Sequence, residues 1–238
     1  MPGRPRLYRM FELTAPPVLP FDVIEHILDV LFNDDTKGLQ YVKNFSLVCH
    51  SFLPLCRKHI FSCISINTRV FRYDGEAFRQ LLLESPDIVR YVLKLKIYIE
   101  PSNKHFRCFL SFPVSPLTRL QSLTISYTGL YLEWGKYPSS TQRSLLNLMH
   151  LPTLTHLDMN RISGFPISNL NTCTNIKHLF LHEVDIIDDE ATSSPSWCRK
   201  SMKLQTLHIS TETPWSIFPD IFRKIQQLED LSLQIGGM

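Results

Sequence analysis

A short apolar pattern that recurs along most of the chain is the feature that most constrains its fold. The pattern is an apolar residue, two others, a second apolar residue, one other and a third apolar residue. Its seven occurrences in the 238 residues are Phe61/Ile64/Ile66, Val92/Leu95/Ile97, Leu120/Leu123/Ile125, Leu154/Leu157/Met159, Ile176/Leu179/Leu181, Leu204/Leu207/Ile209 and Leu228/Leu231/Leu233. The middle residues lie 22 to 34 positions apart. Such a period is typical of repeat architectures in which each unit supplies one short strand.

The segments between these occurrences carry helical patterns. Phe78, Leu81 and Leu82 form one apolar stripe, a second helix is expected to begin near Ser140, and a third over 217–225. Strands that alternate with helices favour an α/β fold with a parallel sheet and right-handed crossovers. An ordinary α/β domain whose strands begin with leucine is the alternative.

One face of the predicted sheet should carry polar side chains, because alternate residues of a strand point to opposite sides. If the middle and last apolar residues face the core, their neighbours form the other face. On adjacent strands His156 should then stand beside His178, with Asp158, Phe180 and His208 in the next row. The candidate substrate-binding residues on this face are His156, Asp158, His178, Phe180, His182 and His208.

Three interpretations of this histidine-rich group are open. It is a solvated sheet face, a protein-recognition surface with Phe180 as an aromatic anchor, or a metal site built from the histidines and Asp158. Zinc favours three or four convergent ligands, whereas these positions are spread along a nearly flat sheet. We therefore expect no metal and no cofactor.

The stretch before the repeats, Leu19 to Phe61, predicts a small helical unit. Pro20 suits the first position of a helix, and Ile24, Ile27, Leu28 and Leu31 follow helical spacing. A second helix is expected from about Leu39 to Cys49, and a third with Pro54 in its first turn. The inward-facing residues expected on the second helix are Leu39, Val42, Phe45, Val48 and Cys49. Such a unit carries more apolar surface than it can bury alone.

This stretch resembles the F-box. The resemblance is carried by Leu19-Pro20-Phe21-Asp22-Val23-Ile24, Ile27-Leu28, Leu31 and Ser46-Leu47-Val48-Cys49-His50-Ser51-Phe52, with Phe52 where many F-boxes have tryptophan. It implies docking to the Skp-type adaptor of a cullin–RING ubiquitin ligase. By position, the adaptor-facing or supporting residues would be Leu19, Pro20, Ile24, Ile27, Leu28, Leu47, Val48, Cys49 and Phe52.

With its repeats the chain is similar to fungal F-box proteins that carry degenerate leucine-rich repeats. The organisation implied is an arm over 1–18, an F-box-like helical domain over 19–61 and an irregular leucine-rich-repeat-like solenoid over 62–238. The function implied is substrate recognition for the ligase, with the repeats binding an unknown protein. A ligase-independent interaction scaffold is the alternative. The chain ends just after a strand, so either the C-terminus is short or a partner covers that edge.

Charge and motifs exclude several other functions. A net charge of +3 is too small to favour nucleic acid or membrane partners. The first eighteen residues lack the apolar run of a signal peptide, and the six cysteines show no C-x-x-C pair, so we expect free thiols in the cytoplasm or nucleus. The sequence lacks the catalytic and nucleotide-binding motifs G-x-S-x-G, P-loop, G-x-G-x-x-G and H-E-x-x-H. We therefore expect that the protein is not an enzyme.

Overall fold

The computed structural model describes residues 19–32, 37–67, 74–100, 117–187, 203–211 and 228–235. The chain divides into two compact units, Met1–His59 and Ile60–Met238. The boundary lies between His59 and Ile60 rather than after Phe61. The predicted N-terminal arm over 1–18 and the predicted helix over 217–225 lie outside the described residues.

The first unit is helical. Its elements are α1 (Phe21–Phe32), α2 (Gly38–Phe45), the short 3-10 helix η1 (His50–Phe52) and α3 (Leu53–Ile60). Each α-helix contributes to a small core of Ile24, Leu28, Val42, Cys56 and His59. Helix α1 begins at Phe21, one residue later than predicted, and Pro20 precedes it. The Pro20 carbonyl accepts hydrogen bonds from the backbone N–H groups of Val23 (3.1 Å) and Ile24 (3.2 Å).

The second helix is shorter than predicted. It ends at Phe45, where the Ser46 hydroxyl donates a hydrogen bond to the Lys43 carbonyl (2.6 Å), and a turn follows over 46–48. The expectation that Val48 and Cys49 face inward is therefore wrong, since both are exposed. It is confirmed for the buried Val42 and wrong for Leu39, which is exposed at the start of the helix. Apolar spacing alone did not show this early end, because a local side-chain-to-backbone bond competes with continued helix.

The second unit is built on a seven-stranded parallel sheet, and the order of the strands follows the chain. Its strands are β1 (Cys63–Asn67), β2 (Lys94–Ile99), β3 (Ser122–Tyr127), β5 (His156–Asn160), β8 (His178–His182), β10 (Thr206–Thr211) and β11 (Asp230–Ile235). The predicted register is confirmed along the sheet. The middle residues of the pattern pair in one row, namely Ile64, Leu95, Leu123, Leu157, Leu179, Leu207 and Leu231.

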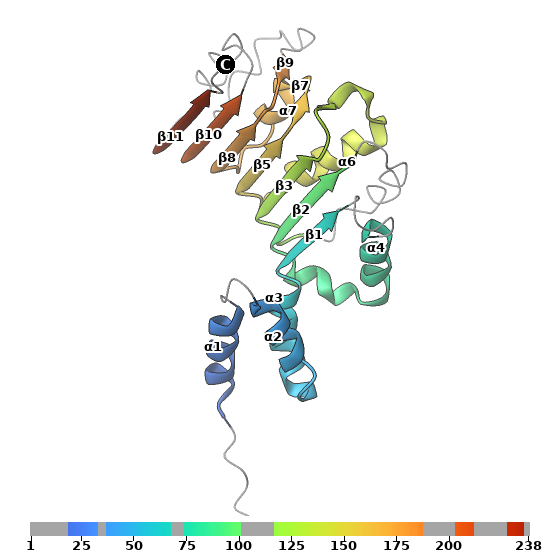
Figure 1. Cartoon of the computed structure of the whole chain (residues 1–238), viewed down its shortest axis with the longest axis vertical. Coiled ribbons are helices and arrows are strands. Elements are labelled where there is room, and N and C mark those ends of the chain that lie inside the picture. Colours follow the sequence, from blue (N-terminus) through green and yellow to red (C-terminus); the bar gives the residue numbers. More distant parts are fainter. Residues whose placement is uncertain are drawn as a thin grey trace, which may run out of the picture. The chain divides into compact units, whose positions relative to one another are not determined.

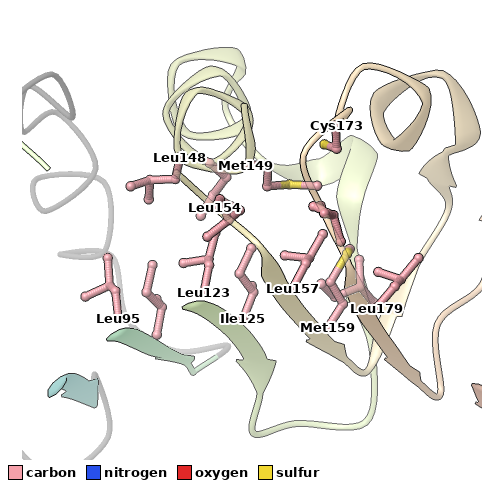
Figure 2. Packing of buried hydrophobic residues seen from close by; sticks show 14 of the residues in the cluster. Leu95, Leu123, Ile125, Leu148, Met149, Leu154, Leu157, Met159, Cys173 and Leu179 are labelled. Atoms are coloured by element: carbon pink, nitrogen blue, oxygen red, sulfur yellow. The ribbon is translucent and has the colours of Figure 1, made fainter. Parts of the chain in front are cut away.

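The described helices of this unit lie on one side of the sheet (Figure 1). They are α4 (Asp74–Glu84), η2 (Pro86–Tyr91), α6 (Ser139–Met149) and α7 (Ile167–Asn171). Phe78 and Leu82 of α4 are buried, as the stripe predicts. Figure 2 shows Leu148 and Met149 of α6 on the same side as strand residues such as Leu123 and Leu157. Burial of these side chains joins sheet and helices into one core.

The last strand departs from the expected burial. Leu231 and Leu233 follow the predicted register but are 45% and 40% exposed. Within the described residues β11 pairs only with β10, and a strand with one neighbour loses the cover that a second would supply. The expectation that every middle and last apolar residue lies in the core is wrong for this strand.

Short strands form two further ladders beside the main sheet. They are β4 (Leu132–Glu133) with β6 (Ile162–Ser163), and β7 (Phe165–Pro166) with β9 (Ile186–Ile187). The buried Trp134 ring, in the 3-10 helix η3 (Trp134–Lys136), meets Phe165 edge-on at 4.8 Å between centroids. The aromatic segment Tyr127–Tyr137 between two repeats is thus partly core, with Tyr127, Leu132 and Trp134 buried.

Candidate functional site

A polar face lies on the side of the sheet that none of the described helices covers (Figure 1). We use "polar face" for the outward residues Lys94, Lys96, Tyr98, Ser122, Thr124, Ser126, His156, Asp158, Asn160, His178, Phe180, His182, Thr206, His208 and Ser210. Each alternates with a buried apolar residue of the same strand. The strand period therefore sets the composition of this face.

His156 and His178 form a stacked pair. They are register partners on β5 and β8, with ring centroids 4.2 Å apart and an interplanar angle of 25°. Their predicted adjacency is confirmed. The Nδ1 atom of His178 lies 3.2 Å from the Thr206 hydroxyl, and that of His156 lies 2.8 Å from the Thr155 hydroxyl. Burial lowers the pKa of His156, and His178 and Lys94 lower that pKa further.

A second aromatic group lies on β8 and β10. The rings of His182 and His208 are 4.9 Å apart, and those of Phe180 and His208 are 6.1 Å apart. Phe180 is half-buried and is the register partner of both Asp158 and His208. The predicted row of Asp158, Phe180 and His208 is therefore confirmed, and it presents an aromatic ring beside a carboxyl group.

Asp158 has an unusual environment within this row. Its Oδ1 atom is buried, and no described residue donates a hydrogen bond to it. Burial raises the pKa of the Asp158 carboxyl, while His182, Lys96 and His208 oppose that rise. A charged acceptor left without a donor is costly in a protein interior. The sequence placed Asp158 on the face but showed neither the burial nor the missing donor.

Replacing Asp158 by asparagine should stabilise the protein at neutral pH. Because folding raises the pKa of Asp158, the folded protein keeps this proton to a higher pH than the unfolded chain. The folded protein therefore loses stability as pH rises from the pKa of Asp158 in the unfolded chain to its higher pKa in the folded protein, and the loss persists at higher pH. In thermal melts at neutral pH we expect Asp158→Asn to raise Tm by on the order of a few degrees.

The gain should disappear below the ordinary carboxyl pKa of about 3.9, where both states are protonated. Asp230→Asn is the matched control, because Asp230 is exposed and should tolerate the change with no shift in Tm. A lower Tm for Asp158→Asn at neutral pH would show that the carboxylate has a stabilising partner.

The chemistry available on the polar face is hydrogen bonding, ring stacking and charge. Among the described residues, no group of three or more His, Cys, Asp or Glu side chains is placed to hold a metal ion. The histidines are separated in pairs along the sheet instead of converging on one point. This geometry suits contact with a surface or an extended segment.

The helical unit carries the other set of predicted site residues, and the structure divides them by exposure. Ile24 and Leu28 are buried in the unit's core, and the Phe52 ring stacks on Phe45 at 4.8 Å. The remaining predicted residues are exposed: Leu19, Pro20, Ile27, Leu47, Val48 and Cys49. Leu47 and Val48 stand out, with 85% and 66% of their surfaces accessible.

Several exposed apolar residues of this unit were not among the predicted contacts. They are Phe21, Val23, Val30, Leu39 and Tyr41. The wide apolar arc of the first helix indicated those on α1, because a three-helix unit cannot bury a stripe of that width. An apolar surface of this extent on a small unit is typical of an interaction site.

Comparisons with known proteins give no family for this chain. Neither a protein-family model, nor a curated protein, nor a solved structure matches it. None of the helices in the described parts of the chain has the length and apolar content to cross a membrane.

Proposed function

We propose that the chain is a substrate-recognition adaptor of a cullin–RING ubiquitin ligase. In this proposal the helical unit binds the Skp-type adaptor, and the polar face of the sheet binds a target protein. The observation that carries it is the set of exposed apolar side chains on the F-box-like unit, above all Leu47 and Val48. These residues belong to the segment that resembles the F-box, and contiguous exposed apolar residues are a common mark of protein interaction sites.

The second unit supports the target-binding half of the proposal. Its parallel strands follow chain order, and the sequence pattern repeats with a period close to that of leucine-rich repeats. We propose that this unit is an irregular leucine-rich-repeat solenoid. Stacked repeats present a continuous row of strand side chains, which provides an extended surface for a partner. The polar residues of this surface could form the hydrogen bonds that protein–protein interfaces need for specificity.

The proposed mechanism is positional. An adaptor that holds a target beside a ubiquitin-loaded enzyme raises the effective concentration of the target's lysines near the reactive thioester. The chain then needs no catalytic group of its own. The second candidate function is a protein-interaction scaffold that acts without the ligase. The polar face supports this function equally well. The two candidates differ in the partner that binds the exposed apolar residues of the helical unit.

A pull-down with purified Skp-type adaptor tests the proposal. The double variant Leu47→Asp/Val48→Asp should reduce adaptor binding by a factor of about 100 or more, because two anchors of an apolar interface become charged. Both side chains are exposed, so the unit should stay folded. Substituting the buried Leu28 would not be informative, because loss of binding would then also report loss of the core.

Leu130→Asp provides a matched control. Leu130 is 87% exposed, close to the 85% of Leu47, but lies in the sheet unit. This control should bind the adaptor as tightly as the wild type. Failure of the wild-type chain to bind would favour the ligase-independent scaffold. Undiminished binding by the double variant would show that Leu47 and Val48 are not the adaptor contacts, which removes the observation on which the proposal rests.

A further inference from the structure

Strands β2 and β3 gather hydrogen-bond donors on the polar face. We use "donor patch" for Lys94, Lys96, Ser122, Thr124 and Ser126. We propose that the donor patch binds an extended acidic segment of the target protein, in which one residue separates two aspartate or glutamate residues. This inference rests on the target-binding half of the proposed function. It does not depend on whether the helical unit binds a ligase adaptor.

The register of the sheet makes the donor patch one continuous area. Lys94 pairs with Ser122 and Lys96 with Thr124, while Ser126 follows on the same side of β3. Adjacent strands lie about 4.8 Å apart, and alternate residues of one strand lie about 7 Å apart. Lys94 is exposed and the other four residues are half-buried, and none of the described helices covers this side of the sheet (Figure 1). The patch is therefore accessible to a partner.

The side chains of the donor patch are not engaged within the protein. Neither ammonium group forms an ion pair with a described residue, and none of the three hydroxyl groups forms a hydrogen bond with one. An ammonium group is a donor only, and each hydroxyl group can donate one hydrogen bond. A ligand that supplies acceptors therefore finds every donor of the patch available.

Positive charge extends from β2 across the uncharged side chains of β3. Burial lowers the pKa of His156, and Lys94 contributes to the same effect. Burial raises the pKa of Asp158, and Lys96 is among the groups that oppose that rise. Both lysines thus act on residues of β5, which lies on the other side of β3 from them.

The acidic groups on this side of the sheet lie outside the donor patch. Asp158 is two strands away from Lys96, Asp230 is on β11, and Glu100 follows the end of β2. No outward residue of β2 or β3 is acidic. The patch therefore combines positive charge with donors and lacks a carboxylate of its own.

This combination selects a partner that bears carboxylates. Charge-assisted hydrogen bonds from ammonium groups to carboxylates are stronger than those between neutral groups. In an extended peptide, alternate side chains point to one side about 7 Å apart, which matches the separation of Lys94 and Lys96 along β2. A nucleic acid fits less well, because its closely spaced phosphates are neutralised by more cations than two lysines supply.

Selection of random dodecapeptides displayed on phage against the full-length chain tests the inference. The enriched peptides should share two acidic residues separated by one other residue. For a fluorescein-labelled peptide from that pool, Lys94→Gln/Lys96→Gln should raise Kd by about tenfold, because two exposed ion pairs are lost. Replacing the two acidic residues of the peptide by their amides should cause a similar loss and requires no change in the protein.

The double variant Lys177→Gln/Lys203→Gln is the matched control. It removes the same charge from two exposed lysines that precede β8 and β10 and lie outside the donor patch. It should change Kd less than twofold. The isosteric Thr124→Val should raise Kd by about threefold, since one hydrogen bond is lost.

Four outcomes would overturn the inference. They are no enrichment of acidic peptides, a Kd that ignores Lys94→Gln/Lys96→Gln, an equal loss in the control variant, and tighter binding of a single-stranded RNA of twelve nucleotides than of the peptide. The adaptor pull-down is independent of these measurements. If the peptide behaves as expected and the pull-down fails, the acidic-segment site stands and the ligase half of the proposed function falls.

Discussion

Replacing Leu179 by aspartate should unfold the sheet unit, whereas the same substitution at Phe180 should leave it folded. Leu179 is fully buried at the centre of β8, between Leu157 and Leu207 on the neighbouring strands. Removal of a buried leucine side chain costs about 2–5 kcal/mol, and a buried carboxylate adds a further penalty. The sum approaches or exceeds the whole stability of a typical domain, about 5–15 kcal/mol.

Circular dichroism melts of the full-length chain measure this difference. Phe180→Asp is the matched control, because it introduces the same charge one residue along the same strand, where the side chain points to the half-exposed polar face. We expect it to retain a cooperative transition. A folded Leu179→Asp variant with an unfolded Phe180→Asp variant would mean that β8 is displaced by one residue, which exchanges the two faces.

Substitution of Gly38 by alanine should destabilise the helical unit strongly. An added Cβ would lie 2.5 Å from the Phe32 carbonyl oxygen and 2.6 Å from that of Leu31. Both atoms belong to the backbone at the end of α1, so no side-chain rotation relieves the clash, and α1 and α2 must separate. Forced overpacking of this kind costs about 1–3 kcal/mol or more. That is a large fraction of the free energy of unfolding expected for a unit of this size.

Hydrogen exchange of the full-length chain reports each unit separately. In Gly38→Ala the amides of α1 and α2 should lose protection, while those of the sheet should not change. Gly135→Ala is the control, because an added Cβ there has no heavy atom within 4 Å. It should leave protection unchanged. Normal protection of α1 in Gly38→Ala would show that the two helices approach less closely than described.

The sheet and its register were predictable because each unit repeats the same information. A strand alternates with period two, and one buried side fixes which alternate residues must be apolar. Seven occurrences of the pattern therefore aligned Leu95, Leu123, Leu157, Leu179 and Leu207 before any contact was known. The same logic placed His156 beside His178, since neighbours across strands follow directly from register.

Features that depend on a single local contact escaped this reasoning. The second helix stops at Phe45, where the Ser46 hydroxyl donates to the Lys43 carbonyl. It begins at Gly38, where the backbone of α1 leaves no room for a side chain. The packing of Trp134 on Phe165 joins residues about thirty positions apart in the chain. Such contacts leave no periodic signal.

The candidate site shows the same division most clearly. Pattern and alternation put Asp158, Phe180 and His208 in one outward row, because only backbone periodicity is needed for that result. The solvent exclusion and unmet hydrogen bond of Asp158 depend on side chains brought from several strands. Likewise, spacing alone identified an apolar helical unit, but packing separated the buried Ile24 and Leu28 from the exposed Leu47 and Val48. Periodicity is a property of the chain, whereas burial is a property of neighbours that meet only in the folded protein.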